Sequence, residues 1–259
     1  MIPAFDELEL CYRSMAALIA GFDDDQWNTR SLCPEWTTKG VVQHLGGVEH
    51  LLTGWRPAEE YEMPPFQLMG EYVEATASLS GAELAARHAD VVDARRADIA
   101  TLTEEVLDHP ITSPIGKVPY RRFMPVRVFD WWVHEQDVRR PLGLPGHESG
   151  PAAETAIDEI QASLGYIVGK KVDLPDGRAI TFDLTGPVRR RMHVRVDGRA
   201  GAVDELEEPD VVVSTDSTTF ALLACGRIDP QEPIDGGVIT WSGDDEWGEQ
   251  AARNLRFTI

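Results

Sequence analysis

The hydrophobic pattern of this chain of 259 residues changes period partway along, and that change constrains the fold more than any other feature. Up to about residue 168, apolar residues recur every three or four positions, which is the spacing of helices with one buried face. Beyond Asp176-Gly177 the pattern alternates every second residue, as in strands with one buried face. We therefore expect two domains, a helical domain over residues 1–168 and a small α+β domain over residues 169–259.

Five helices are expected in the first domain. Ser80 is followed three residues later by Glu83, which is the pattern of a capping box at a helix start. The stretch that holds Pro110, Pro114 and Pro119 is expected to be a loop, because proline interrupts regular backbone hydrogen bonding. The expected helices are Pro3 to Ile19, a segment after Thr37 or Thr38, Ser80 to about Leu102, roughly Pro125 to Arg140, and about Gly150 to Val168.

The second domain is expected to combine short strands with two helices. Residues 179–184 and 192–196 flank a Gly186-Pro187 turn and are predicted to form a hairpin. Gly226 is placed to close the C-terminus of a short apolar helix, since glycine readily adopts the left-handed conformation found there. The other expected elements are strands at Val211 to Val213 and Gly237 to Trp241, and helices at Thr218 to Ala224 and Glu246 to Leu255.

Charge and cysteine content narrow the range of partners. The 44 acidic and 24 basic residues give a formal net charge of -20, which repels phosphate backbones and anionic lipid surfaces. We therefore expect no nucleic acid and no membrane among the partners. Cys11, Cys33 and Cys225 are widely spaced and predict no disulfide framework. The acidic start and the absence of a long apolar run predict a cytoplasmic protein.

Three side chains could hold a metal ion. His44 lies on the apolar stripe of the second helix, between Val41 and Val48, so its imidazole should point inward. Asp130 and His134 are four residues apart on the fourth helix, where side chains lie about 5–6 Å apart at Cβ. That spacing suits two ligands of one ion, and an apolar setting makes an unpaired carboxylate costly. An equally good interpretation of the spacing is that Asp130 only orients His134 through a hydrogen bond.

Other polar residues have weaker patterns. Asp137 shares a helix face with His134 and could support it, although a capping or salt-bridge role fits as well. Cys33 has no base beside it in the sequence, so loop packing is favoured over a reactive thiol. Neither the H-E-x-x-H zinc-protease motif nor a nucleotide-binding glycine loop is present. A basic group could attract an anionic substrate or be paired on the surface: Arg121, Arg122, Arg127, Arg139 and Arg140.

Several motifs together resemble a known family. Leu32–Thr37 reads LCPEWT, Val41–Leu45 reads VVQHL, and Arg127–Gly143 reads RVFDWWVHEQDVRRPLG. These segments resemble the two signatures of the mycothiol-dependent maleylpyruvate isomerase family, which belongs to the DinB-like four-helix bundles. Cys225–Arg227 and Trp241–Asp244 are similar to the sterol-carrier-like domain that follows the bundle in this family. The resemblance therefore implies a two-domain α + α/β chain, with a DinB-like four-helix bundle before a small α+β sterol-carrier-like domain.

The resemblance also implies a cofactor and a chemistry. The family binds zinc, or another divalent metal, through residues that correspond to His44, Asp130 and His134. The characterised isomerase has glutamate at the position of Asp130, one methylene longer. Mycothiol would be the thiol cosubstrate, and a small electrophilic molecule the substrate. Arg227 is our candidate for binding a substrate carboxylate, because its planar fork suits that group; capping of the preceding helix or pairing with Asp229 is the alternative.

Three functions are compatible with the sequence. The first is an enzyme that uses zinc and mycothiol for cis–trans isomerisation or S-transfer. The second is a metal-dependent hydrolase, in which zinc lowers the pKa of water to about 7. The third is a non-catalytic binding protein for a small apolar ligand. A requirement for thiol in turnover favours the first, turnover without thiol the second, and absence of metal from the purified protein the third.

Overall fold

The structure is a computed structural model that describes residues 2–258, and it divides into two compact units between Gly146 and His147. The predicted boundary lay further along the chain, at 168/169, and differs by the segment that contains α8 (Pro151–Ala162). This helix buries Ile157 and Ile160 and packs against a helix of the second unit. Helical periodicity identifies an apolar face but does not tell which core covers it, so the sequence assigned α8 to the bundle.

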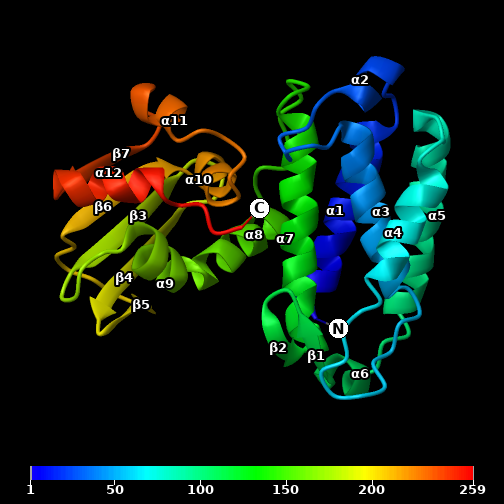
Figure 1. Ribbon diagram of the computed structural model, residues 1–259, viewed down its shortest axis with the longest axis horizontal. Coiled ribbons are helices and arrows are strands. Elements are labelled where there is room, and N and C mark those ends of the chain that lie inside the picture. The colour runs from blue at the N-terminus through cyan, green and yellow to red at the C-terminus, as the bar shows by residue number, and fades with distance from the viewer. Residues whose placement is uncertain (1, 259) are drawn as a thin grey trace. The chain divides into compact units, whose positions relative to one another are not determined.

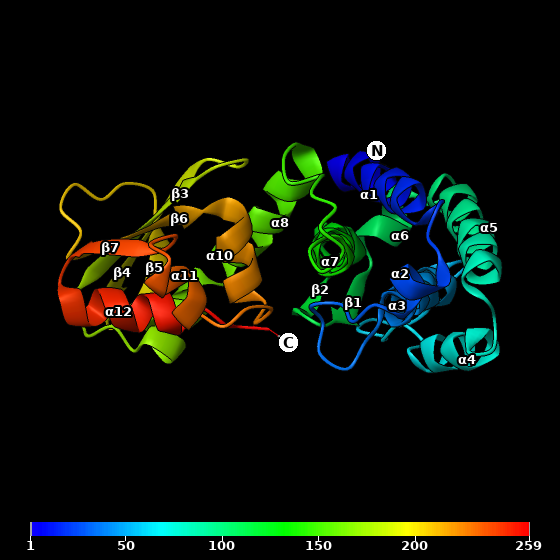
Figure 2. The same ribbon diagram turned by 90° about the horizontal axis from the view of Figure 1, so that it is seen from above.

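The N-terminal unit is a helical bundle, as predicted. Its four long helices run alongside one another (Figures 1 and 2), with α1 packed against α5 and α7, and α3 against α4, α5 and α7. The elements are α1 (Pro3–Ile19), α2 (Asp24–Asn28), α3 (Thr38–Leu52), α4 (Gln67–Thr76), α5 (Gly81–Ile99), α6 (Glu104–Asp108), β1 (Pro110–Ser113), β2 (Gly116–Pro119) and α7 (Tyr120–Arg139).

The helix starts follow the capping residues in the sequence. The Thr37 hydroxyl accepts a hydrogen bond from the backbone N–H of Gly40 at the start of α3, at 3.4 Å. At the start of α5, the Ser80 hydroxyl accepts from the Glu83 N–H at 3.3 Å, and Glu83 Oε2 accepts from the Ser80 N–H at 2.8 Å. The predicted capping box is therefore confirmed, because both halves of the motif are formed.

Helix α7 begins earlier than predicted, so that Pro125 lies inside it rather than at its start. An interior proline costs about 3 kcal/mol through a lost hydrogen bond and a steric clash. The added turn buries Tyr120, Phe123 and Met124 to 3% exposure or less. Burial of large apolar side chains is worth about 1.5–3 kcal/mol each, so the packing of three of them outweighs the cost of the proline.

The proline-rich stretch before α7 is not a loop, and that prediction was wrong. β1 and β2 form an antiparallel hairpin in which Ile111 pairs with Val118. Pro110 and Pro119 sit at its outer ends, where a strand tolerates a residue without an N–H. Ile111 is fully buried, so the hairpin closes one end of the core of the bundle.

The C-terminal unit combines a mixed sheet with helices, as predicted. The strand order is β5-β4-β3-β6-β7; β3 and β6 are parallel and the other neighbours antiparallel. The predicted hairpin is confirmed as β3–β4. Besides α8, the elements are α9 (Leu164–Tyr166), the π-helix η1 (Ile167–Val172), β3 (Ala179–Thr185), β4 (Arg190–Asp197), β5 (Arg199–Val203), β6 (Val211–Asp216), α10 (Ser217–Ala224), α11 (Gln231–Asp235), β7 (Thr240–Gly243) and α12 (Asp245–Arg253).

One face of this sheet forms the core of the C-terminal unit. Phe182 on β3 and Phe220 on α10 are both fully buried, with ring centroids 5.7 Å apart. α12 packs against β6 and β7. Gly226 follows α10 with φ of +66°, the left-handed conformation predicted for a residue that ends a helix. Within residues 2–258, no helix combines the length and the apolarity that crossing a bilayer requires.

Candidate metal centre

Two helices of the bundle bring His44, Asp130 and His134 together. His44 is in the middle of α3, and the other two lie one turn apart on α7, which packs against α3. Val41 and Val48, one turn away from His44 on either side, are buried and turn its imidazole inward. One donor atom from each of the three residues lies within 4.8 Å of the other two. The sequence-based grouping of these three side chains is thus what the fold produces.

The imidazole of His44 has a buried nitrogen without a hydrogen bond among the described residues. Its Nε2 is inaccessible to solvent and makes no hydrogen bond with any described residue, although Asp130 Oδ2 lies 3.5 Å away. Burial lowers the pKa of His44 below its usual value, against the opposing effect of Asp130. A neutral imidazole presents a nitrogen lone pair, which is the form that binds metal ions. An ion would satisfy the buried nitrogen that the described residues leave without a hydrogen bond.

His134 is held by a second carboxylate. Its Nδ1 lies 2.9 Å from Oδ2 of Asp137, a fully buried residue one turn further along α7. This contact leaves Nε2 of His134 on the side of Asp130, whose Oδ1 is 3.5 Å away. Histidine ligands of metals commonly donate their other ring N–H to a carboxylate in this way. Asp137 therefore has the supporting position that the shared helix face indicated.

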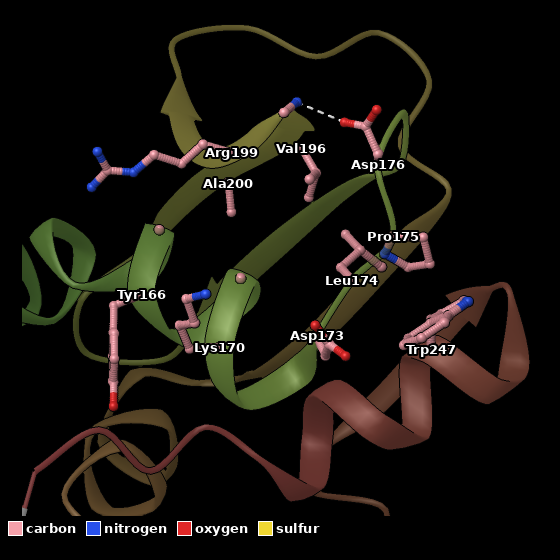
Figure 3. Close-up of a pocket in the computed structure, with 13 residues that line it drawn as sticks. Tyr166, Lys170, Asp173, Leu174, Pro175, Asp176, Val196, Arg199, Ala200 and Trp247 are labelled. Atoms are coloured by element: carbon pink, nitrogen blue, oxygen red, sulfur yellow. Dashed lines mark hydrogen bonds between the residues drawn. The ribbon is translucent and has the colours of Figure 1, made fainter.

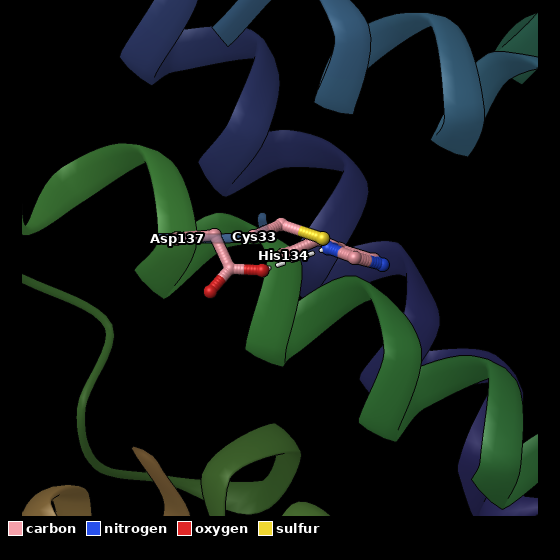
Figure 4. A group of neighbouring side chains, drawn as sticks. All are labelled: Cys33, His134 and Asp137. Carbon is pink, nitrogen blue, oxygen red and sulfur yellow. Dashed lines mark hydrogen bonds and ion pairs between the residues drawn. The ribbon is translucent and has the colours of Figure 1, made fainter. Parts of the chain in front are cut away.

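Cys33 lies on the other side of His134. Its sulfur, one nitrogen of His134 and one oxygen of Asp137 also come within 4.8 Å of one another, and Figure 4 shows the sulfur beside the imidazole ring. The backbone N–H of Leu32 donates to the Asp137 carbonyl at 3.0 Å and fixes the loop there. Sequence analysis missed this neighbourhood, because the contact joins residues about a hundred positions apart and has no local pattern.

The two candidate groups share His134, and the first fits a metal ion better. In the group with Cys33, His134 Nδ1 and Asp137 already satisfy each other by a hydrogen bond. In the group with His44, the buried Nε2 has no such partner. Asp130 Oδ2 lies 3.5 Å from Nε2 of His44, and Oδ1 lies 3.5 Å from Nε2 of His134, so each imidazole has a carboxylate oxygen beside it.

Trp36 forms a wall of the site. Its ring centroid is 4.8 Å from that of His44 and 5.5 Å from that of His134. It precedes Thr37, the residue that caps α3, and packs beside Gly40, where an added Cβ would lie 3.2 Å from Trp36 Cβ. The indole therefore shields the two imidazoles from water on one side.

Asp130 is paired with a cation from its own helix. Arg127 Nη1 donates to Asp130 Oδ2 at 2.7 Å, and the arginine side chain is only 4% exposed. Removal from water acts to raise the pKa of Asp130, but Arg127 and the two imidazoles together hold it well below its usual value. The carboxylate is thus ionised near neutral pH and able to bind a cation.

These side chains have the composition of a catalytic rather than a structural metal site. Two imidazole nitrogens and one carboxylate oxygen would supply three ligands of a tetrahedral ion and would leave a fourth position for a small molecule. Structural zinc sites instead close all four positions, most often with cysteine. The geometry of His44, Asp130 and His134 therefore suits chemistry at an open position.

Arg227 belongs to the C-terminal unit. Its side chain is 9% exposed, and Nη1 donates to the carbonyl of Cys225 at the end of α10, at 2.9 Å. This bond is consistent with the helix-capping alternative. The same residue also borders a hollow of about 430 Å³ that Arg253 and Arg256 line as well, so three guanidinium groups gather around one recess of an acidic protein.

A larger hollow lies elsewhere in the C-terminal unit. It measures about 600 Å³ and opens between α9, η1, the β4–β5 hairpin and α12 (Figure 3). Trp247 and Leu174 supply apolar surface, but Lys170, Asp173 and Arg199 line it too. Its walls are therefore mixed in polarity, which does not match the apolar ligand considered from the sequence.

Two family models match this chain, and solved structures resemble it. Residues 8–139 match the mycothiol maleylpyruvate isomerase N-terminal domain, and residues 154–250 match the MDMPI C-terminal domain. The crystal structure of the mycothiol-dependent maleylpyruvate isomerase aligns with a TM-score of 0.59 and 17% identity over 93% of each chain. A variant of that isomerase with one histidine replaced by alanine gives a TM-score of 0.59 and 18% identity over the same shares. Among curated protein sequences, none matches this chain significantly.

Proposed function

This chain belongs to the mycothiol maleylpyruvate isomerase family, and from that membership we propose that it is a metal-dependent enzyme that uses a low-molecular-weight thiol. The thiol is mycothiol, and the reaction is cis–trans isomerisation of a small electrophilic substrate or transfer of the thiol to it. The observation that carries the proposal is the cluster of His44, Asp130 and His134, with a buried imidazole nitrogen that makes no hydrogen bond among the described residues.

The proposed ligands are His44 and His134 through Nε2 and Asp130 through one carboxylate oxygen. A zinc ion held there would favour the thiolate form of a thiol in its open position. The protein contributes the rest of the arrangement. Asp137 fixes the ring of His134, and Trp36 keeps water from one side of the imidazoles, so that an incoming thiolate stays a nucleophile.

The thiolate then adds to an electron-poor double bond of the substrate. The new carbon–sulfur bond makes the former double bond single and free to rotate. Loss of the thiolate after rotation restores the double bond as its geometric isomer, whereas protonation of the adduct and its release amount to S-transfer. The same residues serve both outcomes, and the substrate decides between them.

Arg227 is proposed to bind a carboxylate of the substrate. It is buried and flanked by Arg253 and Arg256, and a guanidinium can hold a carboxylate with two parallel hydrogen bonds. Arg253 is already engaged with Glu249 at 2.8 Å and Gln231 at 2.9 Å.

The test is a turnover screen with small electrophiles that carry a cis double bond beside a carbonyl, maleylpyruvate first among them. Each is assayed with and without mycothiol, and with and without zinc. We expect turnover only when both are present. Turnover with zinc alone would instead favour a metal-dependent hydrolase. Failure of every combination with a zinc-loaded protein would contradict an enzymatic role for these substrates.

A further inference from the structure

A chain of buried charges leads from the core of the bundle to the candidate metal centre. Glu49 on α3 is fully buried. Its Oε1 accepts hydrogen bonds from Arg127 Nη2 and Trp131 Nε1, both at 2.8 Å, and its Oε2 accepts from Arg95 Nε at 3.2 Å. One carboxylate is thus held by groups from two other helices, α5 and α7, and has little freedom to move.

Arg127 connects this carboxylate to the metal ligand. Nη2 donates to Glu49, and Nη1 donates to Asp130 Oδ2 at 2.7 Å. The two bonds use the two ends of one planar guanidinium, so the position of Glu49 sets the position of the Asp130 oxygen. The second oxygen, Oδ1, lies 3.5 Å from Nε2 of His134, and Oδ2 itself lies 3.5 Å from Nε2 of His44.

We propose that Glu49 and Arg127 are positioning residues of the metal centre, which fix the orientation of the Asp130 carboxylate beside the two imidazoles. The inference rests on the proposed metal binding by His44, Asp130 and His134. Arg127 acts through Asp130, and Glu49 acts through Arg127; neither is itself a ligand.

Electrostatics alone does not explain a guanidinium at this place, because a cation beside a ligand repels a metal ion. Glu49, however, supplies a negative charge 2.8 Å from Arg127, so the pair adds little net charge to the site. The pair instead fixes the orientation of the Asp130 carboxylate. A carboxylate on a surface would sample several rotamers, whereas Asp130 is tied by a short charged hydrogen bond to a buried group.

Arg127→Lys separates the effect of carboxylate orientation from the effect of the positive charge at position 127. Lysine keeps the positive charge but has one nitrogen, so it cannot span Glu49 and Asp130 as the fork does. Glu49→Gln is the second variant, because it keeps the shape of the side chain and its contact with Trp131. Arg121→Lys is the matched control, since Arg121 lies on the same helix α7 and pairs with the exposed carboxylates of Glu104 and Asp108.

The probe is Co²⁺ alone, titrated into metal-free protein and followed by its visible absorption, with folding checked by circular dichroism. We expect Arg127→Lys and Glu49→Gln to weaken Co²⁺ binding by about 10–100-fold and to change the shape of the Co²⁺ spectrum. The double variant should be little worse than either single one, because both act on the same carboxylate. Arg121→Lys should bind as the unmodified protein does.

Three outcomes would overturn the inference. If the folded Arg127→Lys protein binds Co²⁺ with unchanged affinity and spectrum, the pair only stabilises the bundle. If it binds more tightly, Arg127 competes with the ion for Asp130 instead of positioning it. If the unmodified protein binds no Co²⁺, the proposed metal centre itself fails, and the inference fails with it. The first two results leave the proposed function intact.

Discussion

The two units of this protein differ in what they bury. The bundle encloses charged side chains at 6% exposure or less, among them Glu49, Arg95, Arg127 and Asp137. In the C-terminal unit, as far as residue 258, Arg227 is the one charged residue that is buried. The other buried polar side chains there belong to serine and threonine. Buried charges cost several kcal/mol each unless they are well paired. A core with buried charged side chains therefore points to function. Measurements of stability, pH dependence and turnover can test this difference between the two units.

The largest effect on stability is expected from Arg95→Met. Arg95 is fully buried and bonds Glu49, Asp98 and Tyr120. Loss of one partner from a buried ionic network costs about 3–5 kcal/mol, and we expect that decrease in the unfolding free energy of the bundle, measured by urea denaturation. The neighbouring Arg96→Met is the control, because Arg96 pairs with Glu9 near the surface and should change stability by about 1 kcal/mol at most. An equal loss of stability in Arg95→Met and Arg96→Met would show that the buried charges of the bundle matter no more than charges near its surface.

A second effect concerns pH. His88 on α5 is 2% exposed, and burial lowers its pKa from 6.5 to about 4. The folded bundle keeps His88 neutral, while the unfolded chain takes up a proton below pH 6.5. Protonation of His88 therefore does not reduce the free energy of unfolding above pH 6.5. Below that pH, the free energy of unfolding falls by about 1.4 kcal/mol per pH unit as the pH approaches 4.

The variant His88→Met should flatten this dependence. Unfolding free energies measured at several pH values between 4 and 7 should show a smaller slope for the variant than for the unmodified protein. The control is His50→Met, at a partly exposed position of α3, which should keep the original slope. Parallel curves for His88→Met and the unmodified protein would contradict the assignment of this titration to His88.

A smaller effect is expected from Gly248→Ala in the C-terminal unit. A Cβ at this position of α12 would overlap the indole of Trp241 on β7. Overpacking of this kind costs about 1–3 kcal/mol, and affinity for zinc should not change because the proposed ligands are all in the bundle. Gly201→Ala is the matched control, since a Cβ there meets no atom within 4 Å among the described residues. Thermal unfolding with zinc titration measures both quantities.

The smallest effect on stability, but a large one on turnover, is expected from Arg227→Ala. The variant would lose the proposed hydrogen bond between the Arg227 guanidinium and the substrate carboxylate, which is worth about 1.5–3 kcal/mol. We therefore expect kcat/KM to fall by about 10–100-fold, while the zinc content stays that of the unmodified protein. Steady-state kinetics with a carboxylate substrate measures this change. If kcat/KM is unchanged and only stability falls, Arg227 serves as the cap of α10 through its bond to Cys225.

The parts of the site that could be predicted from sequence are the parts encoded within a single helix. The spacing of Asp130 and His134, and the apolar stripe around His44, are local patterns, and packing of α3 against α7 brings them together. The helix starts at Thr37 and Ser80 were predictable for the same reason, because a cap is a bond between residues three positions apart.

What could not be predicted depends on contacts between distant segments. From the sequence, Arg127 was grouped with arginines that could attract an anionic substrate or be paired on the surface, yet it is buried against Glu49, seventy-eight positions away. Cys33 showed no neighbouring base, and only the fold places it beside His134. The unit to which α8 belongs and the proline-rich hairpin were hard to predict for the same reason. Which elements cover their buried side chains depends on the fold, and local periodicity does not identify those elements.

The central claim is that His44, Asp130 and His134 bind one zinc ion, and metal analysis of purified protein tests it most directly. The protein is purified without chelator, beside His44→Ala and a control, His50→Ala, that removes a histidine from the same helix α3. We expect one zinc per chain in the unmodified protein and in His50→Ala, and loss of zinc from a folded His44→Ala protein. Equal zinc in all three, or none in any after zinc is supplied, would contradict the account.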